Sequence, residues 1–168
     1  MAKFLVIAEK PSVAQSLAKN LSAYQRKDGY LEGNSCIVSW CLGHLAEYVP
    51  PEIYDEKYAK WQFEDLPIIP EVWKVQVSED KKKQFDVICS LMNRADVAYL
   101  VNGCDAGREG ELIFKRVYDL AGCQKPVKRL WISSMEDEAI QKGFQSLNDG
   151  RDYAGLCNAA VCRAQADC

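Results

Sequence analysis

The sequence lacks several patterns that mark common protein classes. It has one histidine, no Cys-x-x-Cys pair, and an opening apolar run that reaches a charge at Glu9. That run is too short for a signal peptide or a membrane span, so we expect no membrane partner and a cytoplasmic location. Zinc ribbons need close cysteine pairs, so the eight cysteines are expected to be free thiols in a reducing compartment.

A strong positive charge is also missing. The net charge is −3 over 168 residues, whereas proteins that coat duplex DNA are usually basic. This weighs only slightly against nucleic acid, because a metal site is itself built from carboxylates and the local field decides what binds. Hydrophobic residues make up 48% of the chain and charged residues 27%, which indicates one folded domain with a real core.

Apolar runs alternate with helical patterns along most of the chain. Continuous apolar runs predict buried strands, and apolar residues at helical spacing predict amphipathic helices. The predicted strands are residues 4–8, 36–42, 97–101 and 127–132, with an edge strand at 72–77. The predicted helices follow residue 12 and cover 81–92, 109–121 (ending near Gly122), 134–147 (capped by Ser134) and 152 onward. This order predicts an α/β fold with a mainly parallel sheet and helices on both faces.

Residues 43–72 interrupt this alternation. Four prolines lie in the stretch, at 50, 51, 67 and 70, and glycine and serine are scarce there. The composition predicts an ordered excursion pinned by proline rather than a flexible linker.

Acidic residues follow two of the predicted buried strands. Glu9 comes directly after residues 4–8, and Asp105 follows 97–101 at the start of the segment DAGREGE. Ligands of parallel sheets bind beyond the carboxyl ends of the strands, and Mg²⁺ needs only one or two carboxylates besides water and substrate phosphate. Asp105 and Glu109 are four residues apart, so a turn entering a helix can bring them together. The alternative is an acidic first helical turn that merely favours the helix dipole.

Several blocks, in this order, carry a family resemblance: FLVIAEKPS at 4–12, WCLGH at 40–44, residues 61–70, DAGREGELI at 105–113 and LWISS at 130–134. Together they resemble bacterial type IA DNA topoisomerases of the topoisomerase III kind, in their metal-binding Toprim domain. The resemblance implies a Toprim domain over residues 1–150 and the truncated start of a following helical domain at 151–168.

The resemblance also implies a metal and a reaction. Glu9, Asp105 and Glu109 match the family's Mg²⁺ ligands, with Mn²⁺ as a possible substitute, and Gly107 stands where many members have a middle aspartate, which leaves a second metal in doubt. Glu9 also matches the glutamate that exchanges a proton with the 3′ oxygen of the cut strand. Lys10 matches the lysine at the scissile phosphate.

Arg108 is the third catalytic residue implied by the resemblance, and Glu111 fits beside it. In the family a tyrosine attacks a phosphate of one DNA strand, stays joined to the 5′ end, and reseals the break after strand passage. None of the eight tyrosines here lies in the family's Thr-Tyr-Pro-Arg setting. We therefore expect the chain to be inactive alone and to work with the remainder of a topoisomerase in cis. A stand-alone Toprim nuclease or primase-like protein is the alternative.

Three further residues are candidates for contacting single-stranded DNA. Trp61 could stack on a base, His44 could touch DNA or orient Glu9, and Arg163 could reach a phosphate. Each has a plainer interpretation: a core tryptophan, a buried hydrogen-bonded histidine, and an exposed arginine. A nucleotide-binding module is less well supported, because neither G-x-x-x-x-G-K-[ST] nor a strand-linked G-x-G-x-x-G occurs.

Overall fold

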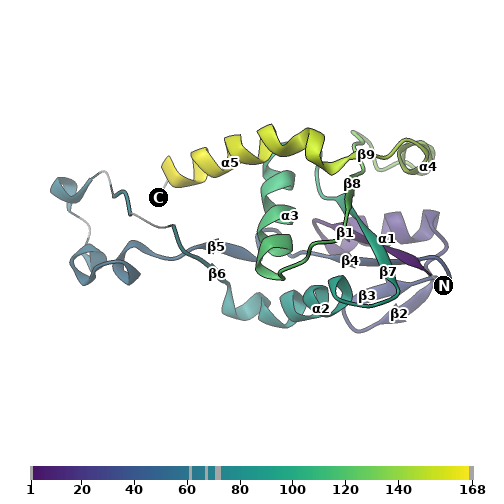
Figure 1. The fold of residues 1–168 in the computed structure, drawn as a ribbon, viewed down its shortest axis with the longest axis horizontal. Coiled ribbons are helices and arrows are strands. Elements are labelled where there is room, and N and C mark those ends of the chain that lie inside the picture. The colour runs from purple at the N-terminus through teal and green to yellow at the C-terminus, as the bar shows by residue number, and fades with distance from the viewer. Residues whose placement is uncertain (1, 61, 67, 71–72, 167–168) are drawn as a thin grey trace.

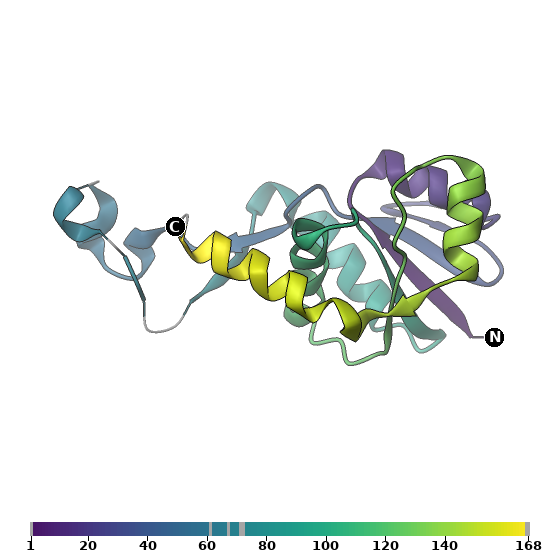
Figure 2. The same ribbon diagram turned by 90° about the horizontal axis from the view of Figure 1, so that it is seen from above.

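The protein consists of an α/β body from which one long excursion projects (Figure 1). The structure, a computed structural model, describes residues 2–60, 62–66, 68–70 and 73–166. Seen from above, the excursion lies at one end of the long axis, and the N-terminus lies at the other (Figure 2). The parallel strands of the body run toward the end from which the excursion leaves.

A seven-stranded sheet in the order β2-β3-β4-β1-β7-β8-β9 forms the centre of the body. Strands β4, β1, β7 and β8 are parallel, and the short strands β2, β3 and β9 are antiparallel additions at the edges. The bounds are β1 Lys3–Ala8, β2 Gln25–Lys27, β3 Tyr30–Glu32, β4 Cys36–Trp40, β7 Val97–Gly103, β8 Val127–Arg129 and β9 Asn148–Asp149. The mainly parallel sheet confirms the predicted fold class.

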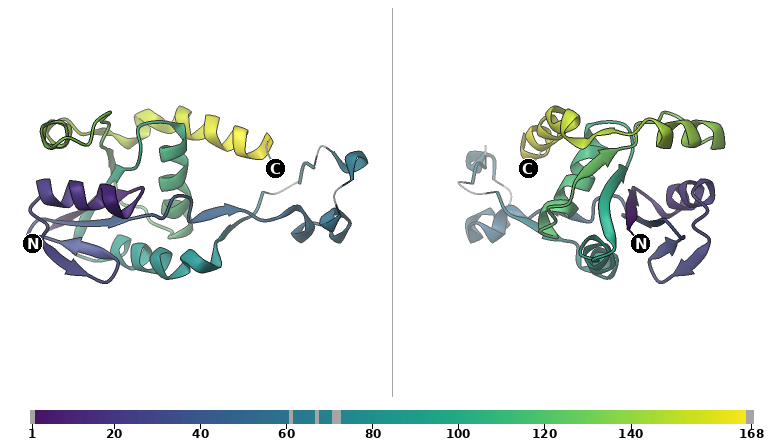
Figure 3. Two further views of the ribbon diagram at one scale, coloured as in Figure 1. Left: turned by 180° about the vertical axis from the view of Figure 1, so that it is seen from behind. Right: turned by 45° about the vertical axis from the view of Figure 1, so that its right-hand side comes forward.

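Helices cover both faces of this sheet (Figure 3, right). Their bounds are α1 Pro11–Asn20, α2 Lys82–Met92, α3 Arg108–Leu120, α4 Asp137–Gln145 and α5 Ala154–Ala166. Leu17 of α1 and Ile140 of α4 share one apolar cluster with Val6 and Val101, whereas Ile88 of α2 and Val117 of α3 share another with residues of the opposite face. Strands β1 and β7 contribute to both clusters because they are buried on both faces, as their apolar runs predict.

The register of β1 with its two neighbours shows which residues emerge together at the carboxyl edge of the sheet. Ala8, its last residue, is paired with Trp40 of β4 on one side and with Gly103 of β7 on the other. The residues that follow these three strands therefore emerge at one edge of the sheet. This is the carboxyl edge, where parallel sheets bind ligands.

Four expectations about the elements need correction. The hairpin β2–β3 was not predicted, because its residues are mostly polar and each strand is only three residues long. The strand predicted at 72–77 is β6, Val75–Val77, which pairs with β5, Ala46–Tyr48, in a separate two-stranded sheet. Strand β8 ends at Arg129. Helix α4 begins at Asp137, and Ser134 only accepts a hydrogen bond from the main-chain N–H of Glu136 at 3.2 Å.

The predicted excursion is ordered in part by short helical turns. Three 3-10 turns, Pro51–Ile53, Glu56–Ala59 and Phe63–Asp65, follow β5 before the chain returns through β6. Helix α5 packs on α3, where Leu112, Cys157 and Ala160 form a small apolar cluster. The boundary predicted at residue 150 remains a prediction. Over the described part of the chain, no helix combines the length and apolar character needed to cross a bilayer.

Candidate metal and nucleic-acid site

Glu9 and Asp105 meet at the carboxyl edge of the sheet. Glu9 directly follows β1, and Asp105 lies in the loop between β7 and α3. The carboxyl group and main chain of Asp105 lie close enough to the Glu9 carboxyl group to shift its pKa, both by hydrogen bonding and by charge. Asp105 is exposed, whereas Glu9 is only 8% exposed. The sequence predicts that these two acids, 96 positions apart in numbering (105 − 9), lie side by side, and the interaction between them agrees with that placement. Their role as metal ligands stays a prediction.

The environment of Glu9 opposes its negative charge. Burial, followed by the hydrogen bond and the nearby charge of Asp105, raises the pKa of Glu9 to about 7, while the neighbouring Lys10 acts in the opposite direction. Two carboxylates held this close repel one another when both are ionised. A divalent cation between them would remove that repulsion, so the donor set fits a hard cation that takes oxygen ligands.

Glu109 contacts a different partner. Its carboxylate lies 3.3 Å from Nε2 of His44, the residue that follows Gly43. Gly43 adopts φ 70°, a left-handed conformation that turns the chain after β4 and that glycine tolerates best. Among the residues the structure describes, no three histidine, cysteine, aspartate or glutamate side chains converge as a ready-made metal cluster. The structure thus pairs Glu9 with Asp105 and Glu109 with His44.

The other residues predicted to be catalytic lie around these pairs. Lys10 is exposed between β1 and α1, and Arg108 is exposed in the first turn of α3. Gly107 precedes that helix with φ 157° and ψ 175°, a backbone conformation that residues with a side chain rarely adopt. A middle aspartate at this position would therefore require a different backbone in the loop, although the space around it is open.

Sequence reasoning missed Arg129. This last residue of β8 is completely buried, and its Nε donates to Oε1 of Glu111 at 2.6 Å. The guanidinium also donates to main-chain carbonyl groups at the end of β7 and in the loop that carries Asp105. Two adjacent charged residues, Lys128 and Arg129, inside the predicted buried strand at 127–132 were the available signal, because buried charges are rare without a partner.

A pocket of about 690 Å³ opens beside the pair formed by Glu109 and His44. It is lined by His44 and Glu109, by Arg116 of α3, and by Arg163 of α5, together with residues at the start of the excursion. Nη1 of Arg116 donates to the carbonyl of Ala46 at 3.1 Å. Two of the three residues predicted to contact DNA, His44 and Arg163, therefore line this pocket. The third, Trp61, lies outside the described residues.

The family model described as "Toprim domain" matches residues 4–135. The chain belongs to the Toprim domain family. This Toprim chain is also 48% identical over 167 residues to DNA topoisomerase 3 of Bacillus subtilis (strain 168), and 48% identical over 167 residues to the protein of the same name from Bacillus anthracis. These alignments cover 99% of this chain and 23% of each relative, so the chain spans less than a quarter of the relatives it matches.

A solved structure supports the same fold. The Toprim chain superposes on full-length topoisomerase I from Thermotoga maritima with a TM-score of 0.62 at 18% identity, covering 94% of this chain and 22% of that one. At this sequence identity the structural similarity supports the fold alone. The resemblance noted in the sequence is confirmed by the family match and the topoisomerase 3 relatives.

Proposed function

We propose that this Toprim domain supplies the Mg²⁺-binding part of a type IA DNA topoisomerase active site, in a protein that cuts and reseals one DNA strand. The observation that carries the proposal is the meeting of Glu9 and Asp105 at the carboxyl edge of the sheet. The 48% identity to topoisomerase 3 proteins supports the reaction class. The remainder of such a topoisomerase, joined in cis, would supply the tyrosine and the other strand-binding surfaces.

Glu9 and Asp105 would hold the metal ion. Glu109 completes the proposed ligand set when its exposed side chain turns away from His44, since it lies four residues beyond Asp105, in the first turn of α3. Water and a substrate phosphate would fill the other positions, as is usual for Mg²⁺, with Mn²⁺ as a substitute. When bound, the cation offsets negative charge on the phosphate being transferred.

The remaining chemistry is assigned to residues of the chain itself. Lys10, exposed beside Glu9, would contact the scissile phosphate, and Arg108 would add positive charge from the first turn of α3. Glu9 would hold the proton exchanged with the 3′ oxygen. Its raised pKa of about 7 suits this role, because proton transfer is most efficient when the pKa lies near the working pH.

Single-stranded DNA is the proposed substrate of the neighbouring pocket. His44 and Arg163 line it, and Arg116 places a further positive charge there, so a phosphate backbone could pass along it toward Glu9. Trp61 is proposed as a stacking residue from the excursion. A cytoplasmic location follows from this proposal, since that is where a bacterial enzyme meets chromosomal DNA.

Titration with Mn²⁺ tests the metal site. We expect wild-type protein to bind one Mn²⁺ weakly, and Asp105→Asn to lose at least about tenfold in affinity because one of few charged ligands is removed. Calorimetry measures both. Asp28→Asn is the matched control: its carboxylate, in the β2–β3 turn, is 81% exposed and lies 3.4 Å from Lys83, and β4 separates this hairpin from β1. Equal affinity in wild type and Asp105→Asn would remove the assignment.

A further inference from the structure

Arg129 forms a dense set of hydrogen bonds at one place in the fold. Its side chain is completely buried, and it donates to four main-chain carbonyl groups: Asn102 at 3.0 Å, Cys104 at 2.6 Å, Asp105 at 2.6 Å and Leu130 at 3.1 Å. Three of these carbonyls belong to residues 102–105, which form the end of β7 and the start of the loop that leads to α3. That segment carries Asp105, the acid whose carboxyl group meets Glu9.

A buried carboxylate balances the charge of Arg129. Oε1 of Glu111, in the first turn of α3, accepts from Nε of Arg129 at 2.6 Å and lies 3.4 Å from Nδ2 of Asn102. Oδ1 of Asn102 in turn accepts from the main-chain N–H of Cys104 at 3.1 Å. An unpaired buried guanidinium would cost several kcal/mol, so Glu111 is what allows Arg129 to remain inside the protein.

The ring of Trp131 lies against the guanidinium group of Arg129. The centroid of the Trp131 ring lies 5.1 Å from Cζ of Arg129, and the same ring is stacked on Tyr153 at 5.0 Å. Arg129 is therefore held by its own strand, by α3 and by an aromatic pair. A side chain fixed in this way can fix the main chain to which it donates.

Glu9 and Asp105 need such a support, because two nearby carboxylates push each other apart when both are ionised. We infer that Arg129, anchored by Glu111, is a positioning residue that keeps Asp105 aimed at Glu9 and thereby sets the affinity of the site for a divalent cation. Arg129 acts on the main-chain carbonyl of Asp105, so the Asp105 carboxylate stays available to a ligand. The inference rests on the proposed metal site.

Arg129→Lys tests this role. Lysine keeps the positive charge but has three donors on one nitrogen, so it cannot reproduce a planar fork that reaches Glu111 and four carbonyl groups. We expect Mn²⁺ affinity, measured by calorimetry on the 168-residue chain, to fall about 10- to 100-fold, as for other residues that orient metal ligands. Hydrogen exchange of the amides at 103–106 should accelerate in the same variant.

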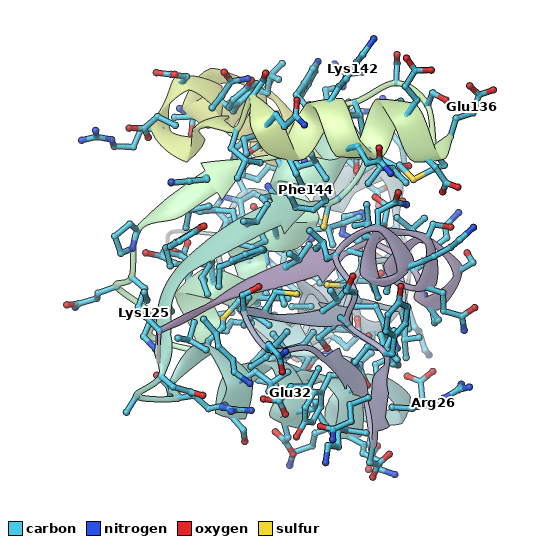
Figure 4. The ribbon with its side chains drawn as sticks, turned by 90° about the vertical axis from the view of Figure 1, so that its right-hand side faces the viewer. Arg26, Glu32, Lys125, Glu136, Lys142 and Phe144 are labelled. Atoms are coloured by element: carbon cyan, nitrogen blue, oxygen red, sulfur yellow. The ribbon has the colours of Figure 1, made fainter. Side chains whose placement is uncertain are left out.

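Arg94→Lys is the matched control. Arg94 also joins two acids, Glu32 at 3.1 Å and Asp96 at 2.7 Å, but at the opposite edge of the sheet, the edge that faces the viewer in Figure 4, where Glu32 is labelled. Its replacement should lower the thermal unfolding midpoint and leave Mn²⁺ affinity within about twofold of wild type. A merely structural role for Arg129 would give this same pattern.

The outcomes separate the inference from the function on which it rests. If wild type binds Mn²⁺ and folded Arg129→Lys binds it equally well, Arg129 is not a positioning residue and the metal site stands. If wild type shows no binding, the metal site and the inference fall together. If Arg129→Lys does not fold, the same measurements are made on Glu111→Gln. Weaker Mn²⁺ binding by this variant supports the inference. Unchanged Mn²⁺ binding together with unchanged hydrogen exchange of the amides at 103–106 overturns it.

Discussion

Gly110 lies in the first turn of α3 against the main chain of Asp105. A Cβ atom at this position would lie 2.0 Å from the carbonyl oxygen of Asp105 and 2.9 Å from its carbonyl carbon. Real Cβ atoms do not come so close to a main chain, so a side chain here would displace either the helix or the loop. The second glycine of DAGREGE is thus explained by close approach and not by an unusual backbone conformation.

Gly110→Ala should therefore destabilise the protein. Alanine is normally the better helix former by about 1 kcal/mol, but the contact with Asp105 should reverse the sign and cost about 1–3 kcal/mol of unfolding free energy. Urea denaturation measures the change. Gly155→Ala in α5 is the control, since a Cβ there meets nothing within 4 Å, and we expect it to be neutral or stabilising. Equal effects in the two variants would contradict this account.

Residues of the site differed in how well the sequence predicted them. Glu9 and Asp105 were predictable because each follows an apolar strand, and the carboxyl ends of adjacent parallel strands share one edge. The contact between Glu109 and His44 was not predictable, since it depends on how the chain turns at Gly43. Arg129 was missed because its partners lie 18 to 27 positions away in sequence, on β7 and α3.

At the scale of elements, a charged cluster secures the edge of the sheet away from the site. Nζ of Lys3 lies 2.6 Å from Oε2 of Glu32, and Nη2 of Arg94 lies 3.1 Å from the same atom. These contacts join β1, β3 and the turn after α2. The hydrogen bond from Lys3 and the second cation, Arg94, hold the pKa of Glu32 below its usual value of 4.5 despite partial burial.

This cluster predicts a specific loss of stability in acid. A carboxylate whose pKa is lower in the folded than in the unfolded state stabilises the fold above the unfolded pKa, near 4.5, and this contribution disappears as the pH falls through the folded value. Glu32→Gln should lower the free energy of unfolding by about 1–3 kcal/mol at pH 7. The difference in unfolding free energy between wild type and variant, measured by urea denaturation, should become smaller from pH 5 to pH 3. A difference that stays constant would show that the ionised Glu32 carboxylate does not stabilise the fold.

The long apolar elements were predictable and the short polar ones were not. Strand β7 and helix α3 have the apolar runs and stripes that their burial requires, so their positions follow from periodicity. Strand β2, with the sequence QRK, is exposed at every position and exists because it pairs with β3. The start of α4 was placed too early, because Ser134 bonds to a turn before the helix instead of capping it.

At the scale of the whole molecule, the chain carries the proposed metal site, and none of its eight tyrosines lies in a Thr-Tyr-Pro-Arg sequence. We expect the 168-residue chain not to relax supercoiled plasmid with Mg²⁺, because no tyrosine lies in the setting of the attacking residue. Agarose gel electrophoresis measures this. Tyr48, which lines the pocket with His44, provides a check. Relaxation that disappears in Tyr48→Phe would show that the chain has its own nucleophile.

Paramagnetic broadening by Mn²⁺ locates the metal ion directly. In NMR spectra of the isotope-labelled chain, substoichiometric Mn²⁺ should broaden first the amides around Glu9 and Asp105, which come from the ends of β1 and β7. Amides near Glu32, at the opposite edge, should keep their line widths. Broadening centred on the excursion or on α5, with the signals around Glu9 and Asp105 unchanged, would contradict the account.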